Sequence, residues 1–358
     1  MVRGSTRRRF LVTVGAGTVP LAGCFTQQRD DGQDVSGTVT FDGTTDPRET
    51  DRNAVEKRAI EASDPPENGA VVFVYDDGPM TDYTQAFPAH QSYDAPATVG
   101  IVSEWVGRKN FMDRDWMGVT HLTDLVDAGW EIASHTAEHT TVGTYELVED
   151  AAPNDERVYP TGVRHGFWTP KDVELTDGDK TVRANAVGRG TDDTGRYVEL
   201  ADPVGDSFAA GEAVIRYPAD VMKDALLGSK QRLEALGFDV ETFLAPYDDF
   251  DAWSQRFVDD YYIGVANGDH GSRINDPDEF SPYRTRRAYF IEFTEPKFVQ
   301  RDLDAIAERG ALGVFGAHTH KDSVTEDRIR TTLEWIEQRD IEVVTLRDAI
   351  DIYVGDGD

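Results

Sequence analysis

The chain has 358 residues, of which 67 are Asp or Glu and 36 are Lys or Arg, so its formal charge at pH 7 is −31. A surface this acidic repels the phosphates of nucleic acids, and we therefore exclude a nucleic-acid partner. Hydrophobic residues make up 39% of the chain, which excludes wholesale disorder and allows a sizeable core. The excess of carboxylates, together with 28 arginines against 8 lysines, predicts a protein that stays hydrated in very high salt.

The first 24 residues are predicted to be a signal and not a part of the fold. Three consecutive arginines at positions 7–9 precede a short apolar run that ends in Leu21-Ala22-Gly23-Cys24. This is the pattern of a twin-arginine export signal, and Cys24 would be its lipidation site. Cys24 is the only cysteine, which excludes disulfides and cysteine-based zinc sites. We expect export by the twin-arginine route and a lipid anchor on the outer face of the membrane of an extreme halophile.

Beyond the signal, the polar and acidic residues 25–69 predict a flexible tether. From 70 to about 355, short apolar runs alternate with amphipathic stretches. The apolar runs predict buried strands at 71–75, 98–102, 130–134, 242–245, 263–266, 312–317 and 341–345. The amphipathic stretches predict helices at 82–92, 121–127, 219–236, 251–261, 297–309 and 326–338. This alternation predicts an α/β fold whose mostly parallel sheet is closed, or nearly closed, as a barrel.

One region of the chain departs from this alternation. Between residues 147 and 218 the helical period is lost, and short alternating segments are separated by turn signals such as Asp177-Gly178, 188–190 and 193–195. We therefore predict a β-rich insertion at 147–218 within the catalytic domain, 70–355.

Two carboxylates, Asp76 and Asp77, directly follow the first predicted strand and precede a Gly-Pro turn. The carboxyl ends of parallel strands are where α/β enzymes place their active sites. Two adjacent desolvated carboxylates need a cation or a shared proton, since like charges repel. An ordinary turn with two solvated acids is the alternative.

Two pairs of histidines follow further predicted strands: His135 and His139 follow the third, and His318 and His320 follow the sixth. Histidines four residues apart can bind one zinc-type ion. An ion held by these two and Asp77 would leave positions open for water and substrate, which is typical of a catalytic site.

Four segments together resemble the motifs of polysaccharide deacetylases, also called carbohydrate esterase family 4. In chain order, they are Tyr75-Asp76-Asp77-Gly78-Pro79, Ser134-His135-Thr136-Ala137-Glu138-His139, Phe243-Leu244-Ala245-Pro246-Tyr247 and Gly313-Val314-Phe315-Gly316-Ala317-His318. The resemblance covers about 70–350, apart from the insertion. It implies an irregular, incomplete (β/α) barrel with a β-rich insertion, and hydrolysis of N-acetyl groups on amino sugars.

The resemblance also implies a role for each matching residue. Asp76 would be the general base, and His318 the general acid that protonates the leaving amine. The backbone N–H of Tyr247 would stabilise the oxyanion. A divalent metal, usually zinc, would be held by Asp77, His135 and His139.

Two positions depart from the family pattern. Leu244 stands where the family often has an arginine that orients the base, and Arg287, from the segment 283–287, is the candidate replacement. A solvated basic cluster is the alternative for that segment. His320 is the alternative to His318 as the general acid.

We therefore expect a metal-dependent deacetylase that acts on an extracellular glycan. The alternatives are another hydrolase of non-peptide amide bonds, with a small amide as substrate, and a catalytically weak glycan-binding surface protein. Trp105, Trp116, Trp168 and Trp253 are candidates for stacking on sugar rings.

Overall fold

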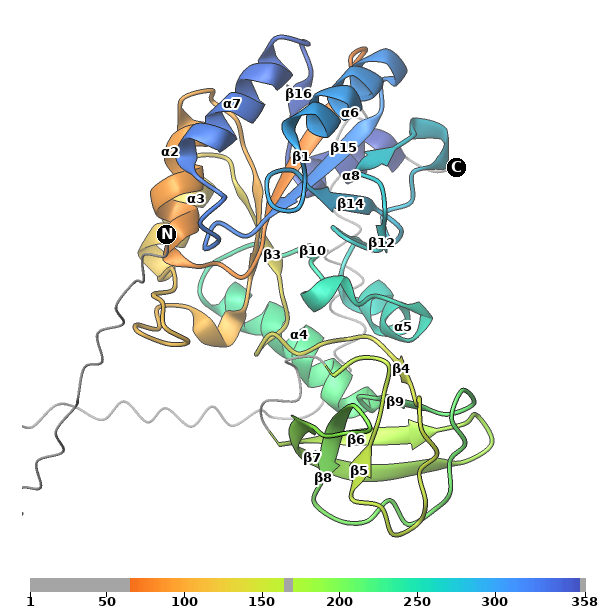
Figure 1. Ribbon diagram of the computed structural model, residues 1–358. Helices are drawn as coiled ribbons and strands as arrows, with labels where there is room; N and C mark the ends of the chain where they lie inside the picture. Colours follow the sequence, from red (N-terminus) through yellow and green to blue (C-terminus); the bar gives the residue numbers. More distant parts are fainter. Residues whose placement is uncertain (1–64, 164–169, 355–358) are drawn as a thin grey trace, which may run out of the picture. The chain divides into compact units, whose positions relative to one another are not determined.

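A mostly parallel, curled sheet carries the strands whose ends hold the candidate residues (Figure 1). Its strands run in the order β11-β10-β3-β2-β1-β15-β14-β12, and among the described strands β11 and β12 do not pair with each other, so the sheet stays open. The strands are β1 (Ala70–Tyr75), β2 (Thr98–Ile101), β3 (Glu131–Ser134), β10 (Thr242–Phe243), β11 (Gly264–Val265), β12 (Asp269–His270), β14 (Arg286–Tyr289) and β15 (Leu312–Ala317). Two more join it: β13 (Ile274–Asn275) pairs antiparallel with β15, and β16 (Glu342–Val343) pairs parallel with β1.

This computed structural model describes residues 65–163 and 170–354, all of which belong to one structural unit, Asn53–Asp358. The predicted signal, residues 25–64 of the predicted tether, and Trp168 lie outside the described residues. In the described part of the chain, no helix combines the length and the hydrophobicity that crossing a bilayer requires.

The continuous apolar run of β1 is explained by burial on both faces of the strand. All six residues of β1 and of β15 are buried, as expected for strands inside a parallel sheet. Alternate residues of β1 enter different clusters, because side chains alternate along a strand. Phe73 and Tyr75 join the larger core, whereas Val72 and Val74 pack in a second cluster with α8 (Leu346–Val354).

Helices flank the sheet and connect its parallel strands. They are η1 (Asp82–Ala86, a π-helical turn), α2 (Phe87–Gln91), η2 (Ser103–Trp105), α3 (Val119–Asp127), α4 (Ala219–Ala235), η4 (Pro246–Asp248), α5 (Ala252–Tyr261), η5 (Pro277–Glu279), α6 (Pro296–Arg309), α7 (Glu326–Glu337) and α8 (Leu346–Val354). Local chemistry sets several ends: the Asp251 carboxylate accepts from two backbone N–H groups at the start of α5, and α6 stops at Gly310, whose φ is +61°.

A second, antiparallel sheet lies between β3 and α4 in the chain (Figure 1). Its strands are β4 (Tyr145–Glu146), β5 (Arg157–Val158), β6 (Lys171–Thr176), β7 (Thr181–Thr191), β8 (Arg196–Leu200) and β9 (Val214–Arg216), in the order β4-β9-β6-β7-β8-β5. Tyr145 donates a hydrogen bond of 2.5 Å from its hydroxyl to Asp249, which ties this sheet to the loop after η4.

The predicted fold class is confirmed: an α/β protein with an open, curled parallel sheet and an added β-rich sheet. Several details of the prediction were wrong. Residues 188–190, predicted as a turn, lie inside β7, where the pairing with β8 shifts at Gly188, and the predicted helix 82–92 is divided into η1 and α2. The sequence reading also missed β12, β13, β14 and α8, because the three strands are short and polar.

Candidate active site

The candidate residues meet at one edge of the main sheet, at the carboxyl ends of its parallel strands. Register brings the first two together: Tyr75 at the end of β1 pairs with Ala317 at the end of β15. The next residues, Asp76 and His318, are therefore neighbours, and the Asp76 backbone N–H donates to the Ala317 carbonyl at 3.1 Å. The ends of β3, β10 and β14 reach the same edge.

Asp77, His135 and His139 form the cluster that could hold a metal. Oδ1 of Asp77 lies 3.4 Å from Nε2 of His135 and 3.2 Å from Nε2 of His139. Tetrahedral zinc with bonds of about 2.0–2.2 Å separates neighbouring ligand atoms by roughly 3.3–3.5 Å, so these spacings fit one ion. Oδ1 of Asp77 is also buried and has no hydrogen-bond partner among the described residues. A buried, unpartnered carboxylate oxygen facing two imidazole nitrogens fits a divalent cation.

The surrounding hydrogen bonds orient both imidazoles for metal binding. Nδ1 of His135 lies 2.7 Å from the carbonyl oxygen of Leu244; because a carbonyl only accepts, Nδ1 carries the proton and Nε2 is left with its lone pair. Nδ1 of His139 bonds to the Tyr247 hydroxyl at 2.7 Å. Such outer contacts fix the tautomer of metal-binding histidines. Burial lowers the pKa of His139, which favours the neutral form.

Two of the three cluster residues have a left-handed backbone conformation. Asp77 has φ of +80° and His139 has φ of +60°, a region that residues other than glycine seldom adopt. The burial of Asp77 alone would raise its pKa, but the histidines outweigh it and hold the pKa well below its usual range. The carboxylate is therefore ionised and available as a ligand.

Arg287 of β14 supplies the cation next to Asp76. Its guanidinium donates to both carboxylate oxygens of Asp76, at 2.5 and 3.0 Å, and to Asp248 at 2.7 Å. Burial opposes the charge of Arg287, but the two carboxylates raise its pKa well above the usual value. Gly316 makes room for this group, because a Cβ there would lie 3.1 Å from three guanidinium atoms.

Leu244 occupies a different place from an orienting arginine. Its side chain is fully buried in the cluster that contains Val72 and Val74, and it packs over Gly100. A charged side chain directed into this cluster would be buried without a partner. The orienting cation therefore comes from the neighbouring part of the sheet, on β14.

His318 is held by Glu292. Nδ1 of His318 lies 2.6 Å from a carboxylate oxygen of Glu292, which also accepts from the backbone N–H of His318 at 3.0 Å, and Nε2 points to Asp76 at 3.5 Å. Burial lowers the pKa of His318, but the charge of Asp76 and the hydrogen bond to Glu292 outweigh it and raise the pKa to about 9.

His320 has different surroundings. Its Nδ1 is buried without a hydrogen-bond partner in the described chain, 3.8 Å from Asp77. Burial lowers its pKa to about 4, so the ring is neutral at pH 7. Between the two histidines, the Thr319 hydroxyl donates to the buried Asp82 at 2.5 Å, and burial raises the pKa of that carboxyl well above its usual range.

A cavity of about 350 Å³ is lined by Asp76, Asp248, His318, His320 and the three residues of the metal cluster. Trp105 and Trp116 form part of its wall but are almost fully buried, packed against each other with ring centroids 4.4 Å apart. Trp253 lies instead beneath the guanidinium of Arg216, 3.6 Å from the ring centroid. Trp105 and Trp116 therefore expose little ring surface for sugar stacking.

Tyr247 lines the same cavity and has a left-handed backbone, with φ of +66°. The sequence predicted a role for its backbone N–H; the structure adds the hydroxyl contact to His139.

The sequence reading missed Asp248, Glu292, Asn267 and Asp82. Asp248 directly follows the third motif, and this adjacency was the one signal that the sequence offered. The side chain of Asn267 accepts from the backbone N–H of Ala245 and donates to the backbone carbonyl of Ala245, both at 2.8 Å. It also donates to Asp248 at 2.7 Å.

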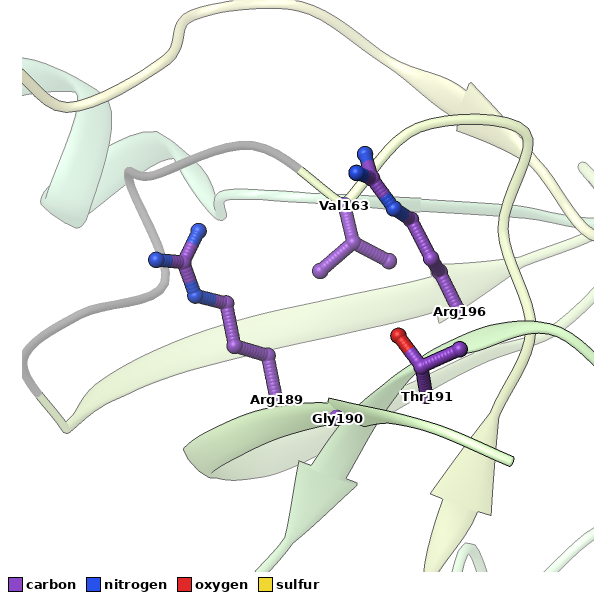
Figure 2. Close-up of a pocket in the computed structure, with 5 residues that line it drawn as sticks. All are labelled: Val163, Arg189, Gly190, Thr191 and Arg196. Atoms are coloured by element: carbon purple, nitrogen blue, oxygen red, sulfur yellow. The ribbon is translucent and has the colours of Figure 1, made fainter. Parts of the chain in front are cut away.

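A second hollow, of about 280 Å³, lies on the insertion (Figure 2). It is lined by Val163, Arg189, Gly190, Thr191 and Arg196. Thr191 pairs with Arg196 across β7 and β8, and Arg189 is two residues before Thr191, so these three side chains share one face of the hairpin.

Residues 63–158 match the family model described as polysaccharide deacetylase. This segment is polysaccharide deacetylase-like. It contains Asp76, Asp77, His135 and His139, whereas Arg287 and His318 lie outside the matched residues. None of the curated proteins matches the chain.

The chain is also similar to several solved structures. One is described as a T48 deacetylase with substrate, with 13% identity over 81% of this chain and 94% of that one and a TM-score of 0.44. Another is a family 4 acetyl xylan esterase from Clostridium thermocellum with a cobalt ion, with 13% identity over 78% and 90% and a TM-score of 0.41. A third is a CE4 family pseudoenzyme from Bacillus anthracis, with 12% identity over 79% and 66% and a TM-score of 0.41.

Proposed function

We propose that this protein is a metal-dependent hydrolase that removes N-acetyl groups from the amino sugars of an extracellular glycan. The observation that carries the proposal is a carboxylate held by an arginine and a histidine held by a carboxylate, both beside one cluster that fits a metal. Asp76 is held by Arg287, and His318 is held by Glu292, at the edge where Asp77 meets two histidines.

Each group has a separate task in this proposal. Asp77, His135 and His139 would hold the cation, which is expected to be zinc and would polarise the acetyl carbonyl and acidify the attacking water. Asp76 takes the proton from that water, and Arg287 keeps both of its oxygens in place. His318, protonated at neutral pH, gives its proton to the departing nitrogen. The raised pKa of His318 and its contact with Glu292 support this residue over His320 as the acid.

We also propose export and lipid anchoring at the membrane surface of a halophile. The support is the arginine run at 7–9, the position of Cys24 after the apolar run, and the formal charge of −31. Replacing Cys24 with Ser should release the protein from the membrane fraction into the medium, and retention of the variant would contradict the anchor.

The direct test of the function is acetate release from N-acetylglucosamine oligomers by the zinc-loaded protein at high salt. The His135→Ala variant should lose both bound zinc and acetate release, because one of three ligands is gone. Metal content is measured by mass spectrometry. His270→Ala, at an exposed histidine on β12, is the control and should retain both. Acetate release by zinc-free His135→Ala would refute a metal-dependent reaction.

The pH dependence tests the acid. A general acid must be protonated, so activity should fall as pH rises through about 9, the pKa of His318. Glu292→Gln removes a charged hydrogen-bond partner, a contact that contributes about 1.5–3 kcal/mol. The alkaline limb of the kcat/KM profile should therefore move down by roughly 1–2 pH units. An unmoved limb would show that another group is the acid.

A further inference from the structure

Two cations that line the catalytic cavity take no part in the catalysis described above. Arg114 and Lys321 both border the cavity, and neither forms an ion pair with any described residue. In a chain with 67 acidic and 36 basic residues, most described arginines are instead paired with a carboxylate, as Arg273 is with Asp302 and Arg347 is with Asp239.

The carboxylates of the site already have other partners. Asp76 and Asp248 are bonded to Arg287, and Glu292 is bonded to His318. Asp77 faces the two histidines of the metal cluster. Arg114 and Lys321 are therefore not needed to balance the catalytic acids.

The loop that carries Arg114 is well defined. The Trp116 indole N–H donates to the Phe111 carbonyl at 2.9 Å, and the Arg114 guanidinium lies over the Trp116 ring, 5.7 Å from its centroid. Two residues of this loop, Met112 and Asp113, have left-handed backbones with φ of +56° and +60°. Strain of this kind persists where the surroundings fix a conformation, often at ligand sites.

Lys321 reaches the cavity from a different chain segment, the one that follows β15. Its backbone N–H donates to the His318 carbonyl at 3.0 Å, in the turn that follows β15. The charges of both Arg114 and Lys321 act on His320, where they add to burial in lowering its pKa. Two segments distant in sequence thus bring positive charge to the same part of the cavity.

We infer that the substrate is an acidic glycan and that Arg114 and Lys321 bind an anionic group on a sugar next to the N-acetylated one. This inference rests on the proposed function and names its substrate class. The recognised chemistry is a carboxylate or a sulfate, which guanidinium and ammonium groups bind through charge-assisted hydrogen bonds.

The insertion offers a second contact for a longer acidic chain. Arg189 and Arg196 border the hollow in Figure 2 from one face of the β7–β8 hairpin. The charge of Arg189 acts against burial in its effect on the pKa of Tyr247, which lines the catalytic cavity. An acidic glycan extending from the cavity toward the hairpin meets cations there too.

The test compares three oligosaccharides of equal length at about 1 M salt, where the Debye length of roughly 3 Å screens long-range repulsion. One alternates N-acetylglucosamine with glucuronic acid, one is 6-sulfated N-acetylglucosamine, and one is a neutral chitin oligomer. Acetate release gives kcat and KM, and fluorescence anisotropy gives binding to the zinc-free protein.

Lys321→Glu and Arg114→Gln should each raise KM and Kd for an acidic oligomer by about 10–100-fold, which corresponds to one charged hydrogen bond. Both variants should leave kcat and the neutral oligomer nearly unchanged. Lys223 is exposed on α4 and lies outside the cavity. Lys223→Glu changes the net charge by the same amount as Lys321→Glu and should leave KM and Kd for the acidic oligomer unchanged. Arg196→Glu should weaken the binding of long acidic oligomers only.

The two acidic oligomers distinguish a carboxylate site from a sulfate site, and preference for either one over the neutral oligomer supports the inference. Equal binding of neutral and acidic oligomers would overturn it. So would a loss of affinity in Lys321→Glu that is equal for neutral and acidic oligomers. Failure of the proposed function is a separate result: no oligomer would release acetate, while the anisotropy measurement would still report whether the acidic one binds through these cations.

Discussion

Asp76→Asn should lower kcat by about 10²–10⁴-fold while zinc remains bound, because the variant loses the general base but none of the metal-binding groups. The amide keeps the size of the carboxyl group and retains an acceptor for Arg287. The measurement is single-turnover acetate release together with metal content per chain.

Asp77→Asn is the matched variant. It alters the adjacent residue by the same atoms, yet it should lose zinc as well as activity, since Oδ1 of Asp77 faces both histidines. This pair of results would show that Asp76 acts as the base and Asp77 as a metal ligand. If Asp76→Asn also lost zinc, or if it kept full activity, this division of roles would be wrong.

Arg287→Met should destabilise the protein by about 3–5 kcal/mol, because removing one partner of a buried ion pair leaves the other charge uncompensated. Here two carboxylates, Asp76 and Asp248, lose their cation together. The arginine normally holds the pKa of Asp248 down to about 2, against the effect of its burial. The expected result is a lower denaturation midpoint at pH 7 and strongly reduced acetate release.

Two further variants separate charge from geometry at this position. Arg287→Lys keeps the charge but replaces the planar guanidinium, which donates from two nitrogens, with a single ammonium nitrogen, so it should recover more stability than activity. Gly316→Val keeps the arginine and fills the space beside its guanidinium, so activity should fall although no charge is lost. An Arg287→Met variant with unchanged midpoint and rate would show that this contact is dispensable.

In the unaltered protein, the same contacts make stability depend on pH. The pKa of Asp248 is depressed in the folded protein, so its contribution to stability is present above its unfolded value of about 3.9 and is lost as pH falls toward 2. His318 has a raised pKa, so its contribution is present below about 6.5 and is lost as pH rises through 9.

How much of the site the sequence revealed depended on where each residue lies relative to a recognisable strand. Asp76, Asp77 and His135 directly follow long buried runs, and parallel strands bring their carboxyl ends to one edge. His139 lies only four positions after His135, so the spacing of the two histidines is visible in the sequence. Glu292, by contrast, follows a polar strand of four residues that has no apolar periodicity, and its partner His318 is 26 residues away.

The same reasoning applies to the orienting arginine. The sequence offered Arg287 as one of three arginines in 283–287, without a strand to place it. The structure places it because β14 pairs with β15 in a register that sets Tyr289 beside Gly316. That pairing directs Arg287 toward Asp76, 211 positions earlier in the chain.

The sequence by itself determined the α/β class, the β-rich insertion and the residue types of a metal cluster, because strand burial and histidine spacing are local properties of the chain. Only the tertiary structure decided which arginine faces Asp76, which carboxylate holds His318 and which cations border the cavity unpaired. These contacts join distant segments through sheet register and side-chain packing, and neither is encoded in the spacing of neighbouring residues.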